Sequence, residues 1–210
     1  KDQNFKHWKL ATDNDNVLWL TIDRDGESTN SLSMEVLSEL GVIVEDLENN
    51  APAGLVLQSG KPGSFIVGAD VREFDSYDDA EVATDGISQV HRLFNVIEAL
   101  PFPKVAIIDG FCLGGGLELA LCFDYRIASN VDHTRLGFPE IQLGIYPGFG
   151  GSARSVRQAG ASNAMQLMLS SRNLRPGAAR AMGLVDELVG PHGSLRWAAR
   201  RAIKQGRKSR

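Results

Sequence analysis

The segment FCLGGGLELALCFDY, residues 111–125, places three consecutive glycines just before a glutamate that has leucine on either side. A glycine inside a helix costs about 1 kcal/mol relative to alanine, so this cluster indicates that something must approach the bare backbone. If a helix begins near Gly114, its first N–H groups lack partners within the helix and lie at the positive end of its dipole. We therefore predict that Gly114, Gly115 and Gly116 form half of a site for a ligand oxygen that carries developing negative charge.

A second glycine turn could supply the other half of this oxyanion-binding site. In IVGAD, residues 66–70, Gly68 permits an unusual backbone turn at the end of an apolar stretch. The N–H of Ala69 is then expected to be exposed at the end of a strand. Gly-Ala-Asp occurs in many turns, so the motif is only moderately specific by itself.

Two glutamates could take part in the same site. One lies close to the glycine cluster, and both have apolar neighbours in the sequence. Glu118 follows Gly116 by two residues and is flanked by leucines, and Glu140 follows Pro139 in GFPEIQLG. Burial of an isolated carboxyl raises its pKa, and two carboxyls beside one oxyanion site can act as base and acid. The simpler alternatives are that Glu118 is a favourable first-turn charge on a helix and that Glu140 is a surface residue. The two glycine turns together favour the catalytic interpretation.

The rest of the chain alternates strand and helix patterns, which is typical of an α/β protein. Segment 61–70 is expected to be a loop, and segment 134–151, rich in glycine and proline, to contain short elements and loops. The patterns predict strands at 16–23, 53–60, 102–110, 124–129 and 183–189, and helices at 31–49, 79–100, 152–158, 163–169 and 176–182.

Length and charge restrict the class of protein. A chain of 210 residues suits one domain with a single core, and a net charge of -4 gives no reason to expect nucleic acid as the main partner. Cys112 and Cys122 lack metal-site or redox spacing and are expected to be buried packing thiols in a reducing compartment. No apolar run approaches the ~20 residues of a transmembrane helix, and the first ten residues do not resemble a signal peptide. These features predict a soluble, intracellular protein.

The segment Ser194–Arg210 carries seven basic residues and no acidic one. Its apolar residues have helical spacing, so we expect a basic-faced helix that runs into a linker. The alternative is an arm that binds a polyanion. The expected apolar stripe consists of Leu195, Ala198, Ala199, Ala202 and Ile203.

Three segments carry a specific resemblance: SFIVGADVREF (64–74), DGFCLGGGLELALCFDYRIAS (109–129) and GFPEIQLGIYPGFGGSAR (137–154). In order and spacing they resemble the signature blocks of the crotonase (enoyl-CoA hydratase/isomerase) superfamily. This resemblance implies a spiral of repeated β-β-α units over residues 1–190, followed at 191–210 by the basic helix or linker, with the C-terminal covering helices truncated. FIVGAD and LGIYPGFGG are most similar to the hydratase region of multifunctional fatty-acid oxidation α-subunits, where a 3-hydroxyacyl-CoA dehydrogenase domain follows.

The same resemblance implies a reaction and a set of site residues. The expected reaction is hydration of trans-2-enoyl-CoA to 3-hydroxyacyl-CoA in fatty-acid β-oxidation, with acyl-coenzyme A as substrate and neither a separate cofactor nor a metal. Ala69 and Gly115 match the two N–H donors to the thioester oxygen. Glu118 and Glu140 match two glutamates that hold one water, of which Glu140 protonates the α-carbon. The segment that borders coenzyme A is Ala69, Asp70, Val71 and Arg72.

The resemblance also bears on partners and location. It implies an oligomer, a fused dehydrogenase domain and an associated thiolase subunit, and a cytoplasmic location in a bacterium or a mitochondrial or peroxisomal one in a eukaryote. Glu27 is a departure from the family pattern, because relatives often carry a basic residue near coenzyme A at this position.

Three alternatives remain open from the sequence. A Δ3-Δ2 enoyl-CoA isomerase typically relies on one glutamate, at the position of Glu140, so the presence of both favours a hydratase. The chain could also be a non-catalytic acyl-CoA-binding fragment. A serine hydrolase is disfavoured, because no G-x-S-x-G motif is present and no histidine has triad spacing. The four histidines, interpreted as surface or structural residues, are His7, His91, His133 and His192.

Overall fold

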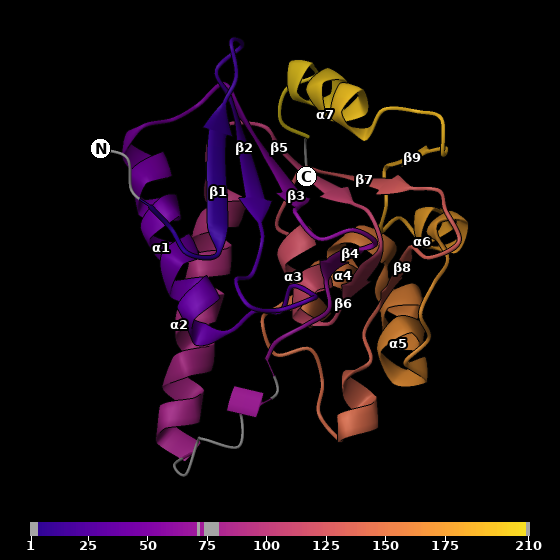
Figure 1. Ribbon diagram of the computed structural model, residues 1–210. Coiled ribbons are helices and arrows are strands. Elements are labelled where there is room, and N and C mark those ends of the chain that lie inside the picture. Colours follow the sequence, from indigo (N-terminus) through magenta and orange to yellow (C-terminus); the bar gives the residue numbers. More distant parts are fainter. Residues whose placement is uncertain (1–3, 71, 74–79, 209–210) are drawn as a thin grey trace.

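A computed structural model describes residues 4–70, 72–73 and 80–208 (Figure 1). Within these residues the strands form a six-stranded sheet with the order β1-β2-β3-β5-β7-β9 and a three-stranded sheet with the order β4-β6-β8. Among the described strand pairs, β1 and β2 run antiparallel and all the others run parallel. The larger sheet contains β1 (Trp8–Thr12), β2 (Val17–Ile22), β3 (Gly54–Ser59), β5 (Lys104–Ile108), β7 (Tyr125–Ser129) and β9 (Glu187–Val189). The smaller one contains β4 (Ser64–Ile66), β6 (Phe111–Leu113) and β8 (Arg135–Gly137).

Helices cover both faces of the larger sheet. The bounds are α1 (Met34–Asn49), α2 (Ala80–Ala99), α3 (Gly115–Ala120), the 3-10 helix η2 (Glu140–Leu143), α4 (Gly151–Ala159), α5 (Ala161–Ser170), α6 (Pro176–Ala181) and α7 (Leu195–Lys204). Helix α1 begins where Ser33 caps it by accepting a hydrogen bond from the Val36 N–H. Figure 1 shows α1 and α2 on one side of this sheet and α7 on the other.

Alternation along the central strands explains why both faces are covered. In β2, Leu18 and Leu20 belong to the main core with α1, whereas Val17 and Trp19 belong to a second core under α7. Successive side chains of a strand point to opposite faces, so an apolar residue at every position needs a packing layer on each side. The predicted strands and helices of this sheet are confirmed at nearly the expected positions.

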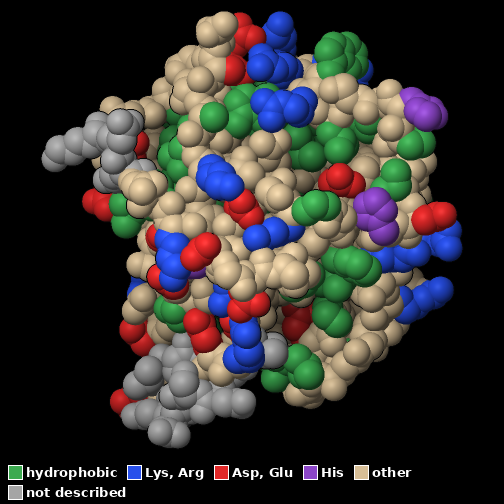
Figure 2. Space-filling model, viewed as in Figure 1, with side chains coloured by type: hydrophobic (Ala, Val, Ile, Leu, Met, Phe, Trp, Pro, Cys, Tyr) green, Lys and Arg blue, Asp and Glu red, His purple; other side chains and the backbone are tan. Residues whose placement is uncertain are grey.

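Helix α7 docks onto the sheet through its apolar stripe. Ala198, Ala199, Ala202 and Ile203 are buried, and Leu195 is partly buried against the same core. Several of the basic side chains contact groups of the sheet layer: Arg200 pairs with Asp13 at 2.8 Å, and the Arg196 guanidinium lies 3.8 Å from the Trp19 ring centroid. Figure 2 accordingly shows basic and acidic side chains intermixed near α7. These pairings favour a docked helix over an arm that binds a polyanion.

Several short elements were not anticipated from the sequence. The segment expected to be a loop, 61–70, contains β4, and β6 separates β5 from the glycine cluster. Strands of three residues are too short to show a period of two, and their pairing partners are remote in sequence. Strand β1 was also missed, because four of its five residues are exposed.

Two expectations about composition are tested by the structure. Cys112 and Cys122 are both fully buried, and they form no disulfide with a described residue, which confirms their interpretation as buried packing thiols. Among the described helices, none combines the length and the apolar character needed to cross a bilayer.

Candidate active site

The glycine cluster lies where β6 ends and α3 begins, packed against β4. A Cβ on Gly116 would lie 2.3 Å from the Ile66 carbonyl oxygen, so only glycine allows α3 to approach β4 this closely. Gly114 has a φ of 50°, and its N–H donates to the Gly137 carbonyl oxygen at 3.0 Å. The glycines therefore bring the first turn of α3 against the smaller sheet.

The Ala69 N–H faces the start of α3. The residues on either side of Ala69 pair with Leu32: the Leu32 N–H donates to the Gly68 carbonyl at 2.8 Å, and the Asp70 N–H donates to the Leu32 carbonyl at 3.0 Å. In such a parallel bridge the N–H of the middle residue points away from the partner. The Ala69 nitrogen lies 3.4 Å from the position that a Cβ on Gly115 would occupy. Neither the Ala69 nor the Gly115 N–H donates to a described residue, so both are available to a ligand.

Glu118 is buried in α3, with 1% of its surface exposed. Its Oε1 accepts hydrogen bonds from the Phe149 N–H at 2.8 Å and the Gly151 N–H at 2.7 Å. Burial raises the pKa of Glu118 to about 7, although these two hydrogen bonds oppose the shift. The negative charge of Glu140 raises the pKa of Glu118 further, and the positive charge of Arg154 lowers it.

Glu140, the first residue of η2, lies beside the glycine cluster. Its Oε1 lies 3.0 Å from the position of a Cβ on Gly114. Its Oε2 is buried and has no hydrogen-bond partner among the described residues, and burial raises its pKa. Its charge also acts on Glu118, so the two carboxyls lie within electrostatic reach of each other. An uncompensated buried oxygen of this kind is available to a ligand or a water.

The raised pKa of Glu118 predicts a specific dependence of stability on pH. Its value in the folded protein, about 7, is above the ordinary value of 4.5. The folded state therefore binds this proton more tightly, and the associated stability is lost as pH rises from about 4.5 through about 7. We compare the free energy of unfolding of Glu118→Gln with that of the native chain. The difference should rise in favour of the variant by about 3 kcal/mol from about pH 4 to about pH 8. Urea unfolding at both pH values measures this gain.

The matched control for this measurement is Glu48→Gln, a substitution of an exposed glutamate on α1. It makes the same chemical change at an exposed position, outside the candidate site, and so serves as the reference for the effect at Glu118. If the stability of Glu118→Gln relative to the native chain does not change with pH, this would contradict a buried Glu118 carboxyl with a raised pKa.

The segment that follows Ala69 carries a charge network. Asp70 is buried and pairs with Arg72 at 2.8 Å and with Arg24 at 2.7 Å, and the hydrogen bond from Arg72 is the main reason that the pKa of Asp70 is well below its usual range. Arg72 is exposed and also pairs with Glu27 at 2.8 Å. Val71, predicted to border coenzyme A, lies outside the described residues.

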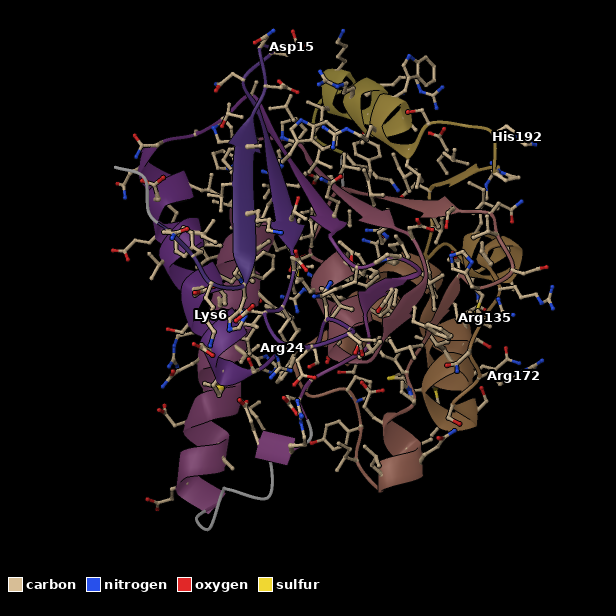
Figure 3. The ribbon with its side chains drawn as sticks, in the orientation of Figure 1. Lys6, Asp15, Arg24, Arg135, Arg172 and His192 are labelled. Carbon is tan, nitrogen blue, oxygen red and sulfur yellow. The ribbon has the colours of Figure 1, made fainter. Side chains whose placement is uncertain are left out.

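Arg24 was not singled out from the sequence. It follows β2 by two residues and lies beyond the end of that strand in Figure 3. No motif marks it, because its contact with Asp70 joins positions 46 residues apart. Its position beside the segment that holds Ala69 is visible only in the folded chain.

Comparison with known proteins agrees with this architecture. The model of the enoyl-CoA hydratase/isomerase family matches residues 12–209, and the chain therefore belongs to this family. Among solved structures, the enoyl-CoA hydratase from Bacillus anthracis superposes with a TM-score of 0.85 at 30% identity, covering 95% of this chain and 76% of that one. The enoyl-CoA hydratase from Thermoplasma volcanium gives a TM-score of 0.84 at 27% identity, covering 95% and 77%. The predicted α/β crotonase fold is confirmed.

Curated relatives are more similar in sequence. The fatty acid oxidation complex subunit alpha of Aliivibrio fischeri is 41% identical over 209 residues, covering 98% of this chain. That of Vibrio cholerae serotype O1 is 40% identical over 210 residues, covering 99% of this chain. In both cases the chain spans only 30% of the relative's length. The predicted resemblance to these α-subunits is confirmed.

Proposed function

We propose that this chain hydrates trans-2-enoyl-CoA thioesters to 3-hydroxyacyl-CoA. The observation that supports the proposal is that the N–H groups of Ala69 and Gly115, neither of which donates to a described residue, lie close together beside the glycine that Glu140 Oε1 approaches. Glu118 is buried in the same first turn of α3 and is affected by the charge of Glu140. Membership of the enoyl-CoA hydratase/isomerase family supports an acyl-CoA thioester as the substrate. No separate cofactor or metal takes part in the proposed reaction.

The two N–H groups bind the thioester carbonyl oxygen. Addition to the β-carbon of a 2-enoyl thioester moves negative charge onto this oxygen as an enolate forms. Donors that already face the oxygen stabilise that charge without reorganisation, and one such donor typically contributes about 3–4 kcal/mol. Neither N–H of this pair has to give up a hydrogen bond to a described residue before it binds substrate.

The two glutamates transfer the protons. Water bound between them gives one proton to the ionised Glu118, and its oxygen forms the new bond to the β-carbon. Protonated Glu140 gives its proton to the α-carbon as the enolate collapses, so the product has gained one water. The excess proton on Glu118 then returns to Glu140 through the next water. Burial raises the pKa of both carboxyls, so the pair can hold the one proton that this transfer requires.

The relatives' names suggest the metabolic setting. Since they are fatty acid oxidation complex α-subunits, we propose that this chain acts in fatty-acid β-oxidation. We also propose that it is joined to a 3-hydroxyacyl-CoA dehydrogenase domain, associates with a thiolase subunit and forms an oligomer.

An absorbance assay tests the proposal. With crotonyl-CoA or a long-chain 2-enoyl-CoA, loss of the conjugated double bond is expected at rates well above those without protein, and 3-hydroxyacyl-CoA should accumulate. Absence of hydration by the folded chain with either substrate would overturn the proposal. Isomerisation of 3-enoyl-CoA is the second candidate, favoured by the family description, and it is measured as the appearance of the same absorbance.

A further inference from the structure

The turn at residues 148–151 presents to Glu118 the two N–H groups that bind its Oε1. Two carbonyl groups of the same turn, those of Gly148 and Phe149, also accept hydrogen bonds from side chains. His91 Nε2 donates to the Gly148 carbonyl oxygen at 2.6 Å, and Arg154 Nη1 donates to the Phe149 carbonyl oxygen at 3.0 Å. The backbone that orients Glu118 is thus fixed by two side chains that do not contact its carboxyl through hydrogen bonds.

Arg154 is itself fixed at each nitrogen. Its side chain is 3% exposed, Nε donates to Glu98 Oε2 at 2.9 Å, and Nη2 donates to Asn95 Oδ1 at 2.7 Å. Together with the Phe149 carbonyl, these contacts engage all three nitrogens of the planar guanidinium. Lysine could replace the charge but not this set of contacts, because it carries a single nitrogen on a flexible stem.

The turn fits closely around this guanidinium. A Cβ on Gly150 would lie 2.3 Å from Arg154 Nη1, and Gly150 has a φ of 91°. The Phe149 ring also contacts Phe94 of α2 edge-on, with centroids 5.9 Å apart. A buried cation this close to the backbone costs free energy unless it is paired and hydrogen-bonded, and here each of its three nitrogens donates a hydrogen bond, one of them to the Glu98 carboxylate.

We propose that Arg154 and His91 are positioning residues for the hydration reaction: they clamp the 148–151 turn so that its N–H groups hold Glu118 in the orientation that proton transfer requires. This inference rests on the proposed function. Neither residue touches the reacting atoms. In addition, the positive charge of Arg154 favours the carboxylate form of Glu118, whereas the negative charge of Glu140 disfavours it.

Arg154→Lys and Arg154→Met separate geometry from charge. Both are expected to lower kcat for crotonyl-CoA on the order of 100-fold, because a shift of about 1 Å at a catalytic group costs this much, while KM stays near the native value. In Arg154→Met the loss of the positive charge also moves the acidic limb of the pH–rate profile to higher pH. Arg154→Lys keeps the charge and should leave this limb near its native position.

Arg157→Ala is the matched control. Arg157 pairs with the same Glu98 at 3.0 Å, but it is exposed and has no contact with the turn among the described residues. Its kcat and pH profile should equal those of the native chain. A fall in kcat as large as that in Arg154→Lys would overturn the proposal, since it would assign the effect to the Glu98 ion pairs in general.

His91→Ala provides an independent test, because it removes the contact to the Gly148 carbonyl and leaves Arg154 in place. A lowered kcat with unchanged KM supports the proposal. Native kcat in folded His91→Ala and in folded Arg154→Lys would overturn it, and if the Arg154 variants do not fold, the result from His91→Ala decides alone.

The pH dependence of stability distinguishes failure of this inference from failure of the proposed function. An inactive native chain refutes the hydratase proposal itself. In that case the pH dependence of stability still reports on the Glu118 carboxyl. Arg154→Met should move the upper end of the pH range, which the pKa of Glu118 in the folded protein sets, to higher pH. An unchanged range would overturn the role of Arg154.

Discussion

Replacing Glu118 with glutamine is expected to lower kcat for crotonyl-CoA hydration by roughly 10²–10⁴-fold, with little change in KM. The amide oxygen of glutamine can still accept from the Phe149 and Gly151 N–H groups, so the turn and the substrate site stay intact. The side chain can no longer take a proton from water. Steady-state absorbance kinetics measure the loss, and Glu140→Gln is expected to act in the same direction because it removes the acid.

Glu48→Gln serves as the control for this loss as well, since an exposed glutamate on α1 has no part in proton transfer. Its kcat should match that of the native chain. Native turnover by Glu118→Gln would exclude Glu118 as the base, and a large rise in KM with native kcat would assign it to binding instead.

Gly115→Ala is expected to lower kcat/KM on the order of 10²–10³-fold by blocking the oxyanion site. The added methyl would lie 3.4 Å from the Ala69 nitrogen and 3.2 Å from the Phe149 ring, which places it in the space that the thioester oxygen must enter. The fold should survive, because alanine is favoured over glycine in a helix and the contact with the ring requires only a small shift. Kinetics and thermal unfolding measured together test both statements.

Gly177→Ala is the matched substitution for this experiment. Gly177 lies in helix α6, and a Cβ there would meet nothing within 4 Å. It should leave kcat/KM near its native value and should not lower stability, because alanine is favoured over glycine in a helix. Gly115→Ala with native kcat/KM would show that the oxygen binds elsewhere, and the two-donor site would have to be abandoned.

The sequence predicted every strand of the larger sheet except β1, and it singled out the residues of the candidate site. Spacing alone predicted α1, because its buried residues recur every three or four positions, and Ser33 marks its start. The placement of Glu118 after Gly116, among leucines, predicted a buried carboxyl with a raised pKa only when it was combined with the two glycine turns and Glu140. Each of these signals comes from neighbouring residues, so a local pattern carries it.

Only the tertiary structure decided which distant groups meet. The position of the Ala69 N–H depends on a bridge to Leu32, and the orientation of Glu118 depends on a turn 31–33 residues later in the chain. The clamp formed by His91 and Arg154 was not predicted, although both residues are visible in the sequence. A hydrogen bond depends on distance in space, and residues separated by more than fifty positions, as His91 is from Gly148, leave no periodic signal of their contact.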